Sequence, residues 1–385
     1  MSWDSIRFGD LYSEDSRNGL TKPSKVRGSG YKMINMGELF ANDRIYDIPM
    51  ELVPLKDSEK KNAKVEKGDL LFARQSLVLE GAGKCCIVMD VSSLTVFESH
   101  LIRVRLDKTK ANPLFYYYYF KSPFSPVSTI VSQCAQAGIR GSDLQELDVS
   151  FPPLPVQDRI ASILTKYDEL IENNQKQIKL LEEAAQRIYK EWFVDLRFPG
   201  HENTEILDGI PAGWRIEEVG KLIGKVPRTT QIMTANYHKS GKIPIIDQSK
   251  TFIAGYTDDE TALVDLGEPV IVFGDHTRIL KYIQFPFAKG ADGTQLIVSA
   301  NKNMPQSLLY CGLVNIDLSN YHYARHFKYL KAESLLVPII DLAKQFDEYA
   351  GDLFKRIQVL RDEISSATEA RDRLLPKLMS GEIEL

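Results

Sequence analysis

Two loops that follow predicted strands carry side chains able to read the edges of DNA bases. The first loop, Asp275-His276-Thr277-Arg278, comes directly after an apolar run that ends in Phe273. Arg is suited to O6 and N7 of guanine, whereas the carboxylate of Asp accepts from N4 of cytosine. The second loop, Arg74-Gln75-Ser76, follows Phe72 in the first half of the chain, and Gln is suited to adenine. An ordinary solvated loop is the alternative for either one taken alone.

Cations stand at matching places ahead of the last predicted strand of each half. Gly138-Ile139-Arg140-Gly141-Ser142 aligns with Ala324-Arg325-His326-Phe327-Lys328 at an offset of 186 residues (324 − 138). Matched cations in two copies favour contact with DNA phosphates or bases over two unrelated solvated loops. The residues predicted to contact DNA here are Arg140, Ser142, Arg325, His326 and Lys328.

The formal net charge of −4 would argue against nucleic acid only if the charge were evenly spread. Residues 16–37 contain no Asp or Glu, and neither do residues 219–246. Acidic residues are dense at 143–183 and 341–372 instead. The two basic stretches therefore extend the predicted DNA surface, with Lys22, Lys25, Arg27, Arg228 and Thr229 as candidate residues.

Four other motifs suggest chemistry but lack parts that the chemistry needs. Asn112-Pro113-Leu114-Phe115 departs from the Asn-Pro-Pro-Phe/Tyr loop of adenine methyltransferases, and no glycine-rich cofactor loop follows a strand. Gly81-Ala82-Gly83-Lys84-Cys85 lacks the first Gly and the Ser/Thr of a phosphate-binding loop. His322 and His326 have the spacing of zinc ligands on a helix without the intervening Glu. The aromatic run 115–120 is expected to pack internally rather than to stack on bases.

The chain contains an internal duplication. Trp3 to Leu11 matches Trp214 to Leu222 at an offset of 211 (214 − 3), and Leu144 to Pro152 matches Leu330 to Pro338 at an offset of 186 (338 − 152). The second register continues without a gap to the end, so the middle of the second copy is shorter by 25 residues (211 − 186). A duplication of this size predicts two similar modules and an approximate two-fold axis.

Each copy ends in a heptad seam, in which residues recur at spacings of 4 and 3. In the first copy the seam consists of Ile160, Leu164, Tyr167, Ile171, Asn174, Ile178, Leu181, Ala185, Ile188 and Trp192. In the second it consists of Phe346, Ala350, Leu353, Ile357, Leu360, Ile364, Ala367, Arg371, Leu374 and Leu378. Two seams in the same register predict two long helices that pair with each other. An amphipathic helix on a globular core is the alternative for one copy alone.

The path of the chain favours an antiparallel pair. Each helix would be about 50 Å long at about 1.5 Å per residue. The chain leaves the first helix near Leu196 and soon enters the second module, so a parallel pair would require that module to return the whole length.

Short alternating runs predict strands at 68–74, 84–89, 100–106, 269–273, 294–298 and 334–337, and helices are expected at 113–122 and 305–314. The predicted fold is α+β: two similar mixed α/β modules separated by two long helices that form an antiparallel coiled coil.

Taken together, these residues resemble the specificity subunit (HsdS) of Type I restriction–modification systems. Leu180 to Phe193 is similar to the central repeated region of that family, and Arg373 to Ile383 is similar to its C-terminal counterpart. Phe273 to Arg278, together with Gly290 to Gly293, is similar to a recurrent form of its target recognition domain. The resemblance spans the chain, although Pro338-Ile339-Ile340-Asp341 departs from the usual Pro-Leu-Pro-x-Gln.

The resemblance implies target recognition domains at 1–152 and 206–338, and conserved regions with long helices at 153–205 and 339–385. Each domain would bind one half of a bipartite site in double-stranded DNA, and the coiled coil would set the gap. The chain would be non-catalytic and without a cofactor of its own. Two methyltransferase (HsdM) subunits would bring S-adenosylmethionine, and two motor-nuclease (HsdR) subunits would bring ATP and Mg²⁺. The expected partner-binding residues, an apolar patch at each end, are Ile188, Trp192, Phe193, Leu374, Leu378 and Met379.

Composition excludes several other classes. No run approaches the roughly 18 apolar residues of a membrane helix, and Met1-Ser2-Trp3 does not begin an export signal. The four cysteines, Cys85, Cys86, Cys134 and Cys311, suggest neither a zinc site nor a disulfide framework, so we expect this chain to lie in the cytoplasm.

Two other functions stay open: an enzyme such as a methyltransferase or nuclease, and a coiled-coil adaptor without DNA contact. Binding of S-adenosylmethionine would test the first, and two separated footprints on DNA would test the second.

Overall fold

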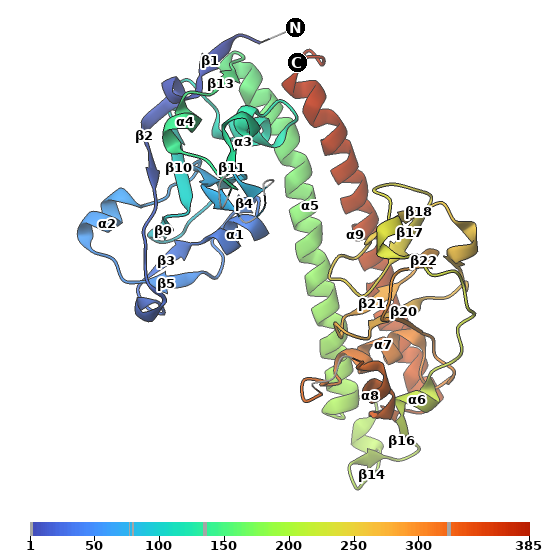
Figure 1. Ribbon diagram of the computed structural model, residues 1–385. Coiled ribbons are helices and arrows are strands. Elements are labelled where there is room, and N and C mark those ends of the chain that lie inside the picture. Colours follow the sequence, from blue (N-terminus) through green and yellow to red (C-terminus); the bar gives the residue numbers. More distant parts are fainter. Residues whose placement is uncertain (1–2, 77, 79–80, 134–136, 322–324) are drawn as a thin grey trace. The chain divides into compact units, whose positions relative to one another are not determined.

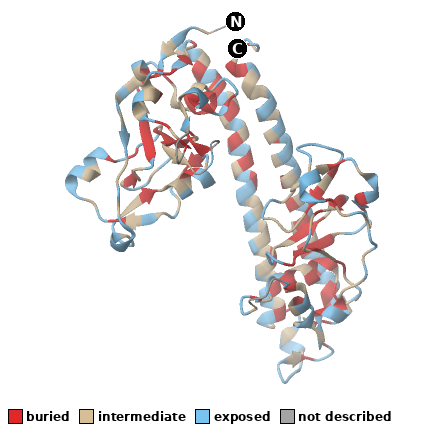
Figure 2. Ribbon diagram, viewed as in Figure 1, coloured by how far each residue is buried: buried red, intermediate tan, exposed pale blue. Residues whose placement is uncertain are grey.

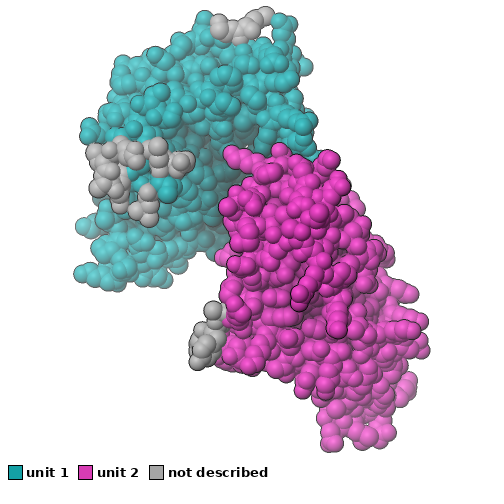
Figure 3. Space-filling model, turned by 45° about the vertical axis from the view of Figure 1, so that its right-hand side comes forward, with its two compact units in different colours: residues 1–172, 365–385 teal, residues 173–364 magenta. Residues whose placement is uncertain are grey.

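The computed structural model describes residues 3–76, 78, 81–133, 137–321 and 325–385. They form two compact units, residues 1–172 with 365–385 (unit 1) and residues 173–364 (unit 2), which Figure 3 colours separately. Each unit contains one mixed α/β module and part of each long helix. The borders predicted at residues 152, 205 and 338 divide modules from helices along the chain, and they stay a prediction.

The first module belongs to unit 1, and Figure 1 labels many of its helices and strands. Its strands are β1 (Ser5–Arg7), β2 (Tyr12–Asn18), β3 (Tyr31–Ile34), β4 (Arg44–Ile45), β5 (Glu51–Val53), β6 (Leu70–Ala73), β7 (Gln75–Ser76), β8 (Cys85–Val88), β9 (Thr95–Phe97), β10 (Leu101–Leu106), β11 (Ser132–Gln133), β12 (Ala137–Gly138) and β13 (Asp148–Ser150). Its helices are α1 (Met36–Ala41), α2 (Asp57–Asn62), α3 (Pro113–Lys121) and α4 (Gly141–Gln145). The largest sheet has the order β2-β10-β6-β8-β4, and β6 and β8 are buried along their whole length.

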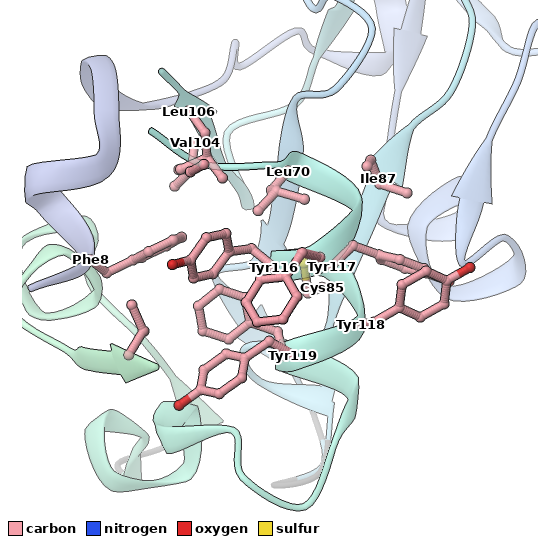
Figure 4. Close-up of a cluster of buried hydrophobic side chains, with 14 of the residues drawn as sticks. Phe8, Leu70, Cys85, Ile87, Val104, Leu106, Tyr116, Tyr117, Tyr118 and Tyr119 are labelled. Atoms are coloured by element: carbon pink, nitrogen blue, oxygen red, sulfur yellow. The ribbon is translucent and has the colours of Figure 1, made fainter. Parts of the chain in front are cut away.

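Helix α3 forms the centre of the first core. Asn112 caps its N-terminus, because the side-chain oxygen accepts from the backbone N–H of Leu114 and Phe115. All the aromatic residues from 115 to 120 are buried, and Figure 4 shows the rings of Tyr116 and Tyr117 among aliphatic side chains of the sheet. The prediction that this run packs internally is confirmed. The structural role of Asn112 is to cap this helix.

The second module belongs to unit 2. Its strands are β14 (Ile206–Leu207), β15 (Ile210–Pro211), β16 (Arg215–Glu218), β17 (Ile243–Ile246), β18 (Gly255–Thr257), β19 (Leu263–Val264), β20 (Val270–Gly274), β21 (Leu280–Ile283), β22 (Phe287–Lys289), β23 (Thr294–Ile297) and β24 (Ser334–Val337). Its helices are α6 (Val219–Leu222), α7 (Gln306–Val314) and α8 (Phe327–Ala332). The strands and helices predicted from the alternating runs are present in both modules.

The two modules share several strand pairings, which confirms the predicted duplication. In each, the first and last strands pair antiparallel: β1 with β13, and β16 with β24. In each, a central strand lies between two antiparallel neighbours, in the orders β10-β6-β8 and β23-β20-β21. In each, one strand has a parallel and an antiparallel partner: β3 with β9 and β5, and β17 with β22 and β18.

The two long helices are α5 (Leu154–Tyr189), which continues into a π-helical turn at Lys190–Val194, and α9 (Ile340–Met379). Every residue of both predicted seams is buried or half-buried, and Figure 2 shows buried positions recurring along α5. In unit 2, side-chain contacts join Asn174 to Glu363, Glu182 to Arg361, and Tyr189 to Phe346, so the helices run antiparallel there. Within the described parts of the chain, no helix is both long and apolar enough to cross a membrane.

A buried polar network joins the first module to both helices within unit 1. The carboxylate of Asp168 on α5 accepts from the hydroxyl of Tyr118 at 2.6 Å and from Nη1 of Arg371 on α9 at 2.6 Å. Arg44 of β4 places Nη1 3.8 Å from the same carboxylate and Nε 3.3 Å from Glu172. The side chain of Asp168 is only 7% exposed, so its charge depends on these partners rather than on water.

We expect Asp168→Ala to lower the free energy of unfolding by about 3–5 kcal/mol, because it leaves two buried or half-buried guanidinium groups without their shared carboxylate. Urea unfolding, together with hydrogen exchange in α3 and α5, measures the loss. Glu169→Ala is the matched control, since that carboxylate is exposed on the next residue of the same helix. Equal effects of the two substitutions would show that the network contributes no stability.

Candidate nucleic-acid interface

The loop after β20 is held by backbone hydrogen bonds at both of its sides. The N–H of Asp275 donates to the carbonyl of Gly293 at 2.7 Å, and the carbonyl of Asp275 accepts from the N–H of His326 at 2.9 Å. The N–H of Arg278 donates back to the carbonyl of Gly274 at 2.7 Å and closes the turn. The predicted loop 275–278 and the predicted segment 325–328 therefore lie side by side.

Two of the predicted DNA-binding residues are buried parts of this arrangement. The carboxylate of Asp275 is occupied by the N–H of Phe327 at 2.7 Å, and Asp275 is 7% exposed. His326 is 4% exposed, and its two ring nitrogens face the carbonyl oxygens of Asp275 at 2.8 Å and Tyr321 at 3.1 Å. Both side chains hold the loop to α8 and are buried there, so little of either is exposed to DNA; their assignment to DNA binding stays a prediction.

The other predicted residues of this region are exposed: His276, Thr277, Arg278, Arg325 and Lys328. Arg278 has a φ of 61°, the left-handed region that costs a non-glycine residue energy. Its Nη1 donates to the carbonyl of Leu318 at 3.1 Å, which uses one of the five guanidinium N–H groups. A strained, partly anchored arginine is oriented in advance, and its remaining donors suit the bidentate contact that guanine offers.

The first module builds the same backbone frame around Arg74. The N–H of Arg74 donates to the carbonyl of His100 at 2.7 Å, and its carbonyl accepts from the N–H of Ile139 at 2.9 Å. Asp275 makes the corresponding two bonds in the second module, to Gly293 and His326. In β7, Gln75 and Ser76 continue from Arg74, pair with β12, and are half-buried. The two candidate loops therefore occupy the same place in the two modules.

The remaining predicted residues of the first module differ in exposure. Arg140 and Ser142 are exposed at the start of α4. Lys25 is exposed, whereas Lys22 and Arg27 are held within the module by ion pairs, Lys22 with Glu59 at 2.8 Å and Arg27 with Glu51 at 2.6 Å. A lysine already neutralised by a carboxylate attracts a phosphate less strongly than an unpaired one.

In the second basic stretch, Arg228 is exposed and Thr229 is half-buried. Both lie between α6 and β17, outside any helix or strand. Their assignment to DNA binding stays a prediction, as does that of every residue in the two loops.

The six predicted partner-binding residues do not form exposed apolar patches. Phe193, Leu378 and Met379 are 5%, 1% and 2% exposed, respectively, because each lies inside the core of its unit. The ring of Phe193 lies 5.2 Å from that of Phe346 and 5.6 Å from that of Trp214. Ile188, Trp192 and Leu374 are half-buried against the same cores. The expected patch is therefore wrong for the three buried residues.

The motifs considered for other chemistry have structural explanations. Lys84 forms an ion pair with Asp43 at 3.2 Å, and the N–H of Gly83 donates to the carbonyl of Ala73, so this segment is tied into the sheet. His322 and Cys134 lie outside the described residues. Across the positions that the structure does describe, no three His, Cys, Asp or Glu side chains gather as metal ligands would.

Sequence reasoning missed the residues that support the loop 275–278 of the second module. The segment Asp247 to Phe252, after β17, lies against the loop, and Lys281 of β21 is buried below it. The ammonium of Lys281 donates to the carbonyl of Thr251 and lies 3.9 Å from Asp247. The only local signal was a polar run directly after the apolar strand Ile243–Ile246.

Burial lowers the pKa of Lys281 to about 8, since desolvation outweighs the attraction of Asp247. In the unfolded chain the ammonium of a lysine is fully solvated, and it titrates near pH 10.4. Between about pH 8 and pH 10 the unfolded chain therefore binds more protons at this site, and the contribution of Lys281 to stability rises with pH.

We expect the free energy of unfolding of the wild type, minus that of Lys281→Met, to rise by about 2–3 kcal/mol from pH 8 to pH 10. Taking the difference removes the opposite slope that buried thiols such as Cys311, with a raised pKa, contribute to both proteins. Lys242→Met, at an exposed lysine, is the control and should show a constant difference. A constant difference for Lys281→Met as well would mean that this ammonium is solvated.

Comparisons with known proteins support these observations. A family model described as the Type I restriction modification DNA specificity domain matches residues 2–183. The Type I restriction enzyme MjaIX specificity subunit of Methanocaldococcus jannaschii is 26% identical over 71% of this chain and 69% of its own length. The putative MjaX specificity subunit of the same organism is 23% identical over 100% of this chain and 94% of its own length.

One solved structure shares the fold over almost the whole chain. It is the crystal structure of a Type I restriction–modification system S subunit from M. genitalium, with a TM-score of 0.62 and 17% sequence identity. The match covers 98% of this chain and 96% of that one, so both modules and both long helices are included.

Proposed function

We propose that this chain, like the specificity subunits of Type I restriction–modification systems to which it is similar, recognises DNA sequence without catalysing a reaction, and that it binds a bipartite DNA site. Each module reads one half of that site. The observation that carries this proposal is the repeated backbone frame, in which Arg74 and Asp275 make equivalent hydrogen bonds and are followed by polar side chains. Two equivalent reading loops on one chain suit two half-sites.

The same proposal includes the partners. Relatives are named as subunits of Type I restriction enzymes, which implies methyltransferase and restriction subunits as further components. A duplicated chain offers two equivalent docking places, so we propose two subunits of each kind. S-adenosylmethionine, ATP and Mg²⁺ would be held by those partners, with none in this chain. Each half-site would be read in the major groove, where the four base pairs are distinguishable.

Arg278→Ala tests the reading of half-sites. We expect it to lower affinity by about 1–3 kcal/mol for the half-site of the second module, and to relax the base preference there while the other half-site keeps its own. Arg140→Ala should act on the first half-site only. Selection from a random duplex library, followed by affinity measurement at fixed salt, gives both preferences.

Lys302→Ala is the control, because Lys302 is an exposed cation of the second module outside both loops. A uniform loss on all sequences with Arg278→Ala would assign that residue to phosphate contact. If the wild-type chain selects a single unsplit site, the bipartite proposal is wrong.

A second test concerns the gap between half-sites. Seven residues inserted after Glu172 in α5 and after Ile364 in α9 preserve the heptad seam and lengthen both helices by about 10 Å. If the helices set the gap, it widens by about 3 base pairs and turns by roughly a third of a helical turn, so binding weakens while the half-site sequences stay the same.

The control is the same insertion in α5 alone, which breaks the seam and should destabilise the chain. An unchanged gap with altered half-site sequences after the double insertion would show that the helices do not measure the site.

A further inference from the structure

Three strand-end segments of the second module meet at Gln248. Its side-chain Oε1 accepts from the N–H of His276 at 3.1 Å, and its Nε2 donates to the carbonyl of Asp292 at 2.7 Å. Its backbone carbonyl accepts from the hydroxyl of Thr277 at 2.7 Å. A single residue therefore joins the end of β17 to the loop 275–278 and to the turn before β23.

The side chain of Gln248 lies close to two glycines, Gly274 and Gly293. A Cβ added to Gly293, which has a φ of +80°, would lie 2.8 Å from Nε2 of Gln248. A Cβ added to Gly274 would lie 2.1 Å from Oγ1 of Thr277 and 2.8 Å from Cβ of Gln248. Real Cβ atoms essentially never approach neighbours so closely, so a side chain at either glycine would displace Gln248 together with Thr277 or His276. The loop conformation and the position of this side chain are thus set together.

The first module has no amide at the equivalent position. The N–H of Gly290 donates to the carbonyl of Ile246 at 2.9 Å, as the N–H of Glu98 donates to that of Ile34 at 3.0 Å. This correspondence places Met36 where the second module has Gln248, two residues after the matching carbonyl. A methionine has no N–H group and only a weak acceptor, so it cannot bridge two loops as the amide does.

We propose that Gln248 is a positioning residue for recognition of the second half-site. It acts through the backbone of His276 and the hydroxyl of Thr277, and it determines where the exposed side chains of His276 and Arg278 meet the DNA. Both ends of its amide are engaged inside the module, so it supports the readers without being one of them. This inference rests on the proposed function, since it concerns how one of the two half-sites is read.

The test compares Gln248→Met and Gln248→Ala with the wild type in the full-length chain. Methionine keeps the length and the unbranched shape, and therefore the packing against Gly274 and Gly293, but it removes both amide hydrogen bonds. Duplexes carry the sequence selected by the wild type, with base changes in the first half-site, in the second, or in both. Thermal unfolding of each protein is recorded in parallel.

We expect both variants to lose about tenfold to a hundredfold of their discrimination at the second half-site, the range of one lost base contact. Discrimination at the first half-site and the unfolding temperature of Gln248→Met should match the wild type. Full discrimination in Gln248→Met would overturn the proposal, and so would an equal loss at both half-sites. If the wild type itself does not discriminate at two half-sites, the proposed function fails and this inference fails with it.

Discussion

The core of each module is completed by the far end of the helix from the other copy of the repeat. In unit 1, Leu378 and Met379 of α9 belong to the same apolar cluster as Phe8 and Leu164. In unit 2, the turn after α5 places Phe193 in the core, as noted above. Separating the helices would expose these side chains at a cost of about 25 cal/mol per Å² of apolar surface. Folding of the modules and pairing of the helices are therefore one constraint.

The pairing also distinguishes the two copies. Asp168 of the first copy corresponds to Phe354 of the second (354 − 168 = 186), and Arg371 corresponds to Ala185 (371 − 185 = 186). The ion pair of unit 1 is thus replaced in unit 2 by apolar packing, in which the ring of Phe354 lies 4.5 Å from that of Tyr282. If Asp168 faced an alanine, its buried carboxylate would lose the counter-charge of Arg371 and keep only the more distant Arg44. The sequence therefore favours pairing α5 with α9 over pairing α5 with a second α5.

In the candidate interface, backbone hydrogen bonds position the loops, and the loop side chains are free to differ. The bonds that position Arg74 and Asp275 are made by backbone groups, which every residue except proline supplies. Side chains at these loops can therefore differ between the modules while the fold stays the same. A supporting side chain differs as well: the second module has the half-buried Gln248 where the first has Met36. A duplicated scaffold of this kind suits the proposed binding of two unlike half-sites.

The sequence by itself determined the duplication, the heptad seams, their antiparallel direction and the place of the two loops. These features depend on spacing along the chain, and the spacing of apolar residues reflects which side of a helix or strand is covered. Only the tertiary structure decided that Asp275, His326 and Phe193 are buried and that Lys22 and Arg27 are already paired. Burial and pairing depend on residues far away in the sequence, such as Gly293 beside Asp275 or Trp214 beside Phe193, and no local pattern records those neighbours.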